Sequence, residues 1–74
     1  MMIPDFQSVM LPSLSIISKH KNISVKEVIR NVSEHFELSE DQRNELLPSG
    51  KQRVIDNRVN WAITYLAKAG LVLR

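Results

Sequence analysis

The sequence of 74 residues has no cysteine, only two glycines and only four aromatic side chains. Without cysteine there is no disulfide and no thiolate metal site. The two histidines, His20 and His35, lie far apart among lysines and glutamates, which predicts solvated side chains and no metal centre. No apolar run approaches the roughly 20 residues that span a bilayer, and the first residues lack the basic region of a signal peptide. We therefore expect one small cytoplasmic domain with no metal, no cofactor and no membrane segment.

Charge is distributed unevenly along the chain, although its net value is only +2. Residues 34–45 carry five acidic side chains and one arginine, which gives a local net charge of −4. Residues 51–74 carry five cations and one aspartate, which gives a local net charge of +4. A one-sided basic segment is typical of a nucleic-acid-binding face, although it also occurs in proteins that bind none. The distribution makes DNA or RNA a candidate partner.

Two helices are predicted in the first half of the chain. The first runs from Asp5 to about Lys19, with Asp5 as its N-cap. Pro12 removes a backbone amide inside this apolar pattern, so we expect a kink or a restart of the helix there. The stretch SVKEVIRNVSEHFEL predicts the second helix, because Ser24 and Glu27 have the spacing of a capping box.

A second capping box, Ser39 with Gln42, predicts a short third helix that ends before Pro48. Two short strands are expected, near residues 22–24 and over residues 71–74. A strand without a partner leaves an open edge, so these two should pair with each other, or the second should pair with another copy of the chain. The order of elements predicts a mainly α fold: a winged helix-turn-helix domain with three main helices, one short extra helix and a truncated wing.

The last and longest helix is predicted from residue 53 or 54 to Ala69, with Gly70 ending it in a left-handed conformation. An advance of about 100° per residue gives this helix three faces. An apolar face should build the core, short polar side chains should point the opposite way, and Trp61 and Tyr65 should flank the core on one side. The predicted core face consists of Ile55, Val59, Ala62, Ile63, Leu66 and Ala69.

The polar face of this helix suits contact with DNA bases, because asparagine pairs bidentately with adenine and threonine offers a methyl group to thymine. Cations just before the helix oppose its dipole, yet they lie where a phosphate would bind. Trp61 is expected half buried against the first helix rather than stacked on a base. For Arg58, a salt bridge to Glu45 and a phosphate contact both stay open. The candidate DNA-binding residues are Lys51, Gln52, Arg53, Asn57, Arg58, Asn60 and Thr64.

No group of side chains in the sequence suits catalysis. Paired carboxylates occur only in the acidic segment, where they favour solvated helix starts, and neither glycine lies in a phosphate-binding loop. A small helical domain also offers little concave surface for a substrate. We therefore expect no enzymatic activity in this chain.

Three segments, IPDFQSVMLP at 3–12, ELLPSGKQ at 45–52 and NRVNWAITYLAKAGL at 57–71, resemble the N-terminal domain of the Mrr family of methyl-directed restriction endonucleases. Their order and spacing are similar as well, and the resemblance covers nearly the whole chain. It implies a winged helix that engages DNA. In that family a separate C-terminal domain of restriction-endonuclease fold carries the nuclease carboxylates and lysine and uses a divalent metal. Nothing in this sequence resembles that catalytic domain.

The sequence departs from its relatives at its end. They continue past the position of Leu73 with a polar, glycine-containing turn and a second strand, whereas this sequence stops at Arg74. We expect a single domain over residues 1–74, a fragment or shortened product without the second wing strand and any nuclease domain.

The resulting hypothesis is a DNA-targeting module of an Mrr-like restriction system, with the helix over 54–69 in the major groove of double-stranded DNA, methylated or unmethylated. One alternative is a protein-interaction module that forms a homodimer through the 71–74 strand. Another is a winged-helix transcription regulator, because a fold does not fix its use.

Overall fold

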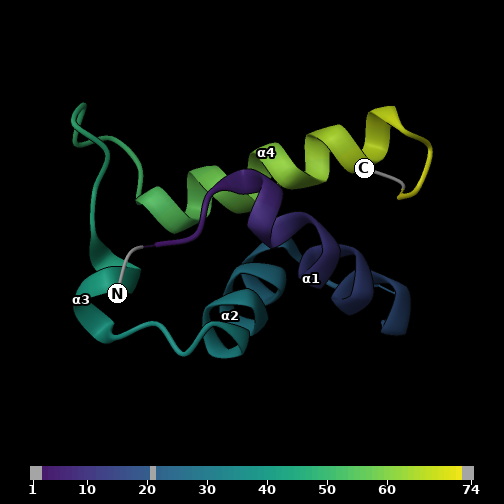
Figure 1. The fold of residues 1–74 in the computed structure, drawn as a ribbon, viewed down its shortest axis with the longest axis horizontal. Helices are drawn as coiled ribbons and strands as arrows, with labels where there is room; N and C mark the ends of the chain where they lie inside the picture. Colours follow the sequence, from purple (N-terminus) through teal and green to yellow (C-terminus); the bar gives the residue numbers. More distant parts are fainter. Residues whose placement is uncertain (1–2, 21, 73–74) are drawn as a thin grey trace.

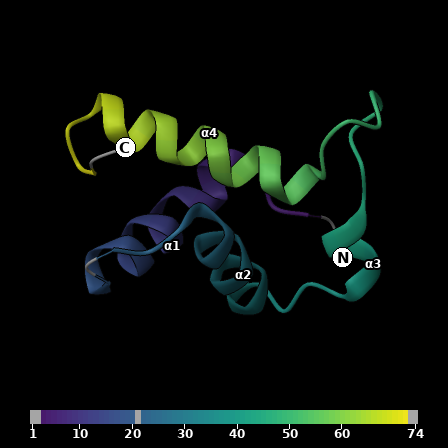
Figure 2. The same cartoon turned by 180° about the vertical axis from the view of Figure 1, so that it is seen from behind.

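Four helices make up the regular structure of the described residues, and α4 lies across two of the others. A computed structural model describes residues 3–20 and 22–72. Figures 1 and 2 show α1 and α2 on one side of α4, with α3 beyond the end of α4 where that helix begins. None of these helices combines the length and the apolar character needed to cross a membrane. The elements in order are α1 (Phe6–Lys19), α2 (Val25–His35), α3 (Glu40–Asn44) and α4 (Val54–Lys68).

The predicted start of α1 is confirmed, and the helix runs through its proline. The Asp5 carboxylate accepts a hydrogen bond from the Ser8 amide at 2.8 Å, as expected of an N-cap. Pro12 lies inside one continuous helix, so the alternative of a restart is wrong. The carbonyl that loses its partner belongs to Ser8, which is exposed, so water can replace the missing amide.

Of the two predicted capping boxes, one is complete. In α3 the backbone amide of Gln42 donates to the Ser39 hydroxyl at 3.1 Å, and the backbone amide of Ser39 donates to the side-chain oxygen of Gln42 at 2.8 Å. In α2 the Glu27 amide donates to the Ser24 hydroxyl at 3.2 Å, but the Glu27 carboxylate accepts from that same hydroxyl instead of from the backbone. The second helix thus has an N-cap without the reciprocal bond.

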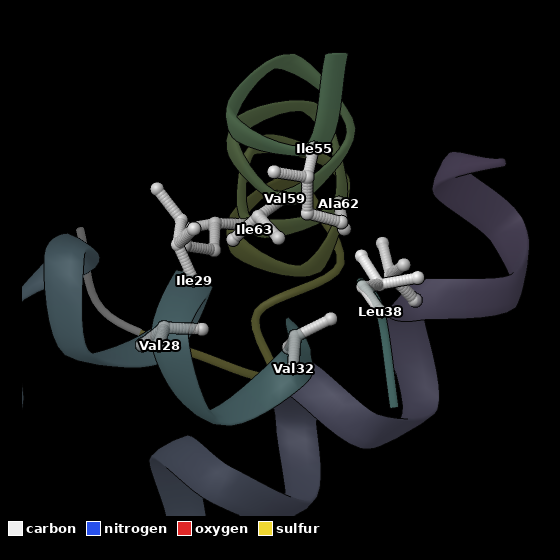
Figure 3. Close-up of a cluster of buried hydrophobic side chains, with 9 residues drawn as sticks. Val28, Ile29, Val32, Leu38, Ile55, Val59, Ala62 and Ile63 are labelled. Carbon is white, nitrogen blue, oxygen red and sulfur yellow. The ribbon is translucent and has the colours of Figure 1, made fainter. Parts of the chain in front are cut away.

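The core is a single aliphatic cluster between α4 and the two helices beside it. Figure 3 shows side chains of α2 and α4 pointing toward one another, with Leu38 closing the cluster from the segment that follows α2. Five of the six residues of the predicted core face of α4 are buried, and only Ala69, at the end of the helix, is exposed. The buried cluster consists of Val9, Val28, Ile29, Val32, Leu38, Ile55, Val59, Ala62 and Ile63.

The two strands predicted for the wing are not found in the described part of the chain. Residues 22–24 lead irregularly into α2, residues 71–72 form a bend, and residues 73–74 lie outside the described residues. The Leu71 amide donates to the Leu66 carbonyl at 2.9 Å, and Val72 packs against the core. These contacts turn the chain back onto α4 and prevent it from extending as a strand. The mainly α class is therefore confirmed without its predicted strands.

Candidate nucleic-acid interface

A tight turn over residues 45–53 presents the basic start of α4. Leu46 and Arg53 face each other in an antiparallel bridge, which the sequence did not predict. Gly50 closes the turn with φ of 72°, a conformation that favours glycine. The side chain of Lys51 is exposed on this turn, and Gln52 is partly buried beside α4. The turn thus holds Lys51, Gln52 and Arg53 at one end of the helix, whereas Arg58 lies within it.

Four of the seven candidate residues line one shallow depression of about 240 Å³ on the surface of α4. It is bordered by Gln52, Asn57, Asn60 and Thr64, and Trp61 forms one side. The Asn57 amide nitrogen donates to the Gln52 side-chain oxygen at 3.3 Å, which joins the turn to the helix. We call the surface made of Gln52, Asn57, Asn60 and Thr64 the polar face.

Local hydrogen bonds hold two of these side chains against the helix. The Asn60 amide nitrogen donates to the Asp56 carbonyl at 2.8 Å, and the Thr64 hydroxyl donates to the Asn60 carbonyl at 2.9 Å. Such bonds to the preceding turn keep short side chains close to the backbone. The side chains of the polar face therefore project only a short distance from the helix backbone, so another molecule can approach the helix closely.

Arg53 is fixed by an aspartate one turn further along. Its Nε donates to Asp56 Oδ2 at 3.1 Å, and its Nη2 lies 3.1 Å from Asp56 Oδ1. Sequence reasoning missed this pair, although a spacing of three residues in a helix is the signal for it. The Asp56 carboxylate also lies in the first turn, where the helix dipole favours a negative charge. Part of the charge of Arg53 is thus neutralised before any ligand binds.

Arg58 lies apart from the polar face and toward the start of α1. Within residues 3–20 and 22–72, no ion pair joins it to Glu45, one of its two predicted partners. The pKa of Asp5 is lowered chiefly by its hydrogen bonds from Ser8, and the positive charge of Arg58 lowers it further. The positive charge of Arg58 thus favours the ionised form of the Asp5 carboxyl at the N-cap of α1.

The aromatic side chains form a second surface on α4, next to the polar face. The Tyr65 ring stacks on Phe6 of α1 with 5.1 Å between centroids, and Trp61 lies 6.2 Å from Tyr65. Trp61 is 50% exposed and Tyr65 is 45% exposed. These three rings border a depression of about 230 Å³. Trp61 is half buried as predicted, and it also borders the polar face.

The comparisons with known proteins give a family. No curated protein and no solved structure matches the chain. The model of one family, described as the Mrr N-terminal domain, matches residues 6–74. The match begins where α1 begins and includes all four described helices. The chain therefore belongs to the Mrr N-terminal domain family.

Proposed function

We propose that this chain is the DNA-targeting module of an Mrr-like restriction system, a winged helix-turn-helix domain that places α4 in the major groove. The observation that carries the proposal is the polar face, which gathers short hydrogen-bonding side chains on the side of α4 opposite the core. Family membership supports the link to a restriction system. Cutting would require a nuclease domain beyond the family match.

The chemistry of the polar face fits the edges of base pairs. An α-helix enters the major groove, where Asn57 and Asn60 can pair with adenine and the methyl group of Thr64 can contact thymine. Lys51 and Arg53 lie at the start of α4. A phosphate can bind there because the first backbone amides of a helix are free and the helix dipole is positive at that end. Arg58, further along the helix, would hold a third phosphate, and Gln52 would assist.

Titration of labelled duplexes, methylated and unmethylated, at two salt concentrations tests this mechanism. With about three phosphate contacts, affinity should fall roughly 40-fold between about 50 and 200 mM salt. Lys51→Ala should weaken binding to all sequences alike, whereas Asn60→Ala should change sequence or methylation preference. Lys19→Ala is the matched control, because Lys19 is an exposed cation at the far end of α1.

Absence of duplex binding, or an affinity that is insensitive to salt, would contradict the proposal. So would an Asn60→Ala variant with the sequence preference of the wild-type protein. A Lys19→Ala variant as weak as Lys51→Ala would show that net charge matters and the position of the cation does not.

The alternative of a protein-interaction module now rests on the exposed rings. Trp61 and Tyr65 present apolar surface beside the polar face, and Leu71 is exposed nearby in sequence. Pairing through a 71–74 strand loses support, because residues 71–72 bend. Sedimentation as a monomer at high concentration without DNA would remove the dimer, and a gene neighbourhood without a nuclease domain would favour a transcription regulator.

A further inference from the structure

A third depression, of about 280 Å³, lies between α2, α3 and the start of α4. Four of the seven residues that line it are cations, and no carboxylate lines it. This cluster was not predicted from the sequence, since its members lie in separate elements and one is the lone cation of the acidic segment. We call it the basic pocket, and its cations are Lys26, Arg30, Arg43 and Arg53.

Two of these cations have no acidic partner in the part of the chain that the structure describes. Arg30 lies 3.6 Å from Glu34, but both side chains are more than half exposed, so the pair is weak. Lys26 and Arg43 form no ion pair within residues 3–20 and 22–72. Together with Arg53, which shares Asp56, they leave excess positive charge around the pocket. Such charge attracts an anion.

Arg43 is held in place before any ligand arrives. Its Nε donates to the Leu38 carbonyl at 3.3 Å, while the side chain is only partly exposed. A guanidinium fixed through Nε keeps its two Nη groups for a bidentate contact with a phosphate. The first turn of α4 also borders the pocket through Arg53 and Ile55, and this helix start has no side-chain cap. Its positive dipole end adds to the attraction.

We infer that the basic pocket takes a phosphate of the DNA backbone, from the same duplex whose bases contact the polar face. This inference rests on the proposed function. Arg53 borders the basic pocket and Gln52, its neighbour in sequence, borders the polar face, so the two surfaces meet at the start of α4. One strand can therefore occupy both. In helix-turn-helix domains the helix before the reading helix crosses the backbone, which is the place of α2 and α3 here.

The double variant Lys26→Gln and Arg43→Gln tests the inference. Lys26 lies exposed in the first turn of α2, where a cation opposes the dipole, so its removal should not weaken the helix. Loss of one phosphate contact should reduce the slope of log affinity against log salt by about 1 and leave sequence preference unchanged. The matched control, Lys19→Gln with Lys68→Gln, removes the same charge from exposed sites elsewhere and should keep the wild-type slope.

A wild-type slope in the pocket variant, with duplex binding intact, would overturn the inference and leave the proposed function standing. NMR titration of the wild-type protein with inorganic phosphate separates the other outcomes. Amide shifts at the pocket with phosphate but none with duplex would overturn the DNA proposal and assign the pocket to a free phosphate compound. Shifts with neither probe would overturn both.

Discussion

Glu37 is a single residue that works against the local preference of the backbone. It follows α2 with φ of 53°, in the left-handed region that non-glycine residues rarely adopt. The backbone amide of Glu37 donates to the Glu34 carbonyl, and the backbone amide of Leu38 donates to the Ser33 carbonyl, both at 3.0 Å. This is a Schellman ending, and it directs Leu38, which is 5% exposed, into the core. Burial of Leu38 thus maintains the strained conformation.

Glu37→Gly should therefore stabilise the protein. Glycine removes the penalty of about 1–2 kcal/mol for a left-handed conformation. It also raises the conformational entropy of the unfolded chain, which offsets part of this stabilisation. We expect a net gain of about 1 kcal/mol in the free energy of unfolding. Urea unfolding measures the difference. Glu37→Ala is the matched control, because it removes the same charge but keeps the Cβ. A glycine variant no more stable than the alanine variant would contradict the strain argument.

At the scale of the element, the start of α1 should give a pH-dependent contribution to stability. The pKa of Asp5 lies below its ordinary value of 3.8, first because its carboxylate accepts from Ser8 and also because of Arg58. Because the pKa is lower in the folded state than in the unfolded state, the ionised carboxylate stabilises the fold. This stabilisation is fully present when the pH is above 3.8, and it is lost as the pH falls through the pKa of the folded state. Thermal unfolding from pH 7 to pH 2 should show this loss.

Asp5→Asn is the control for that experiment, because asparagine also caps a helix but does not ionise in this range. The stability difference between the wild-type protein and this variant should shrink as the pH falls below about 4. A difference that stays constant down to pH 2 would show that the carboxylate charge contributes nothing at the helix start.

The helices could be predicted because each carries its own start or end signal. Asp5, Ser39 and Gly70 act locally, and the structure confirms all three, with Gly70 at φ of 75°. No comparable local signal could show whether residues 71–74 form a strand. The first of these residues take part in the helix ending through Leu71 and pack on the core through Val72, and both effects depend on tertiary contacts.

The candidate site likewise has one part that could be predicted from a single helix and another that depends on tertiary packing. Periodicity alone placed Asn57, Asn60 and Thr64 together, because they belong to one helix. The basic pocket was missed, since Lys26 and Arg43 come together only when α2 and α3 fold against α4. Of the two alternatives for Arg58, the salt bridge to Glu45 is not found within residues 3–20 and 22–72, because the packing of α1 on α4 brings its charge toward the start of α1. The phosphate contact stays a prediction.

At the scale of the whole molecule, the proposed function makes α4 both core and reading surface, so its two sides should be separable by mutation. Ile63 is 4% exposed in the core cluster, whereas Asn60 borders the polar face. Ile63→Val removes one buried methylene and should cost about 1 kcal/mol of unfolding free energy. A domain of this length has about 4–11 kcal/mol in total, so the variant stays folded at 25 °C.

Duplex affinity of Ile63→Val at 25 °C should therefore equal that of the wild-type protein, although its urea midpoint falls. Asn60→Ala should behave in the opposite way, with altered DNA binding and a stability change within about 0.5 kcal/mol, as is usual for a surface substitution. Calorimetric titration and urea unfolding on the same two variants give both quantities. If Ile63→Val weakened DNA binding as much as Asn60→Ala does, the position of α4 on its core would itself set the affinity, and the two sides of the helix would not be independent.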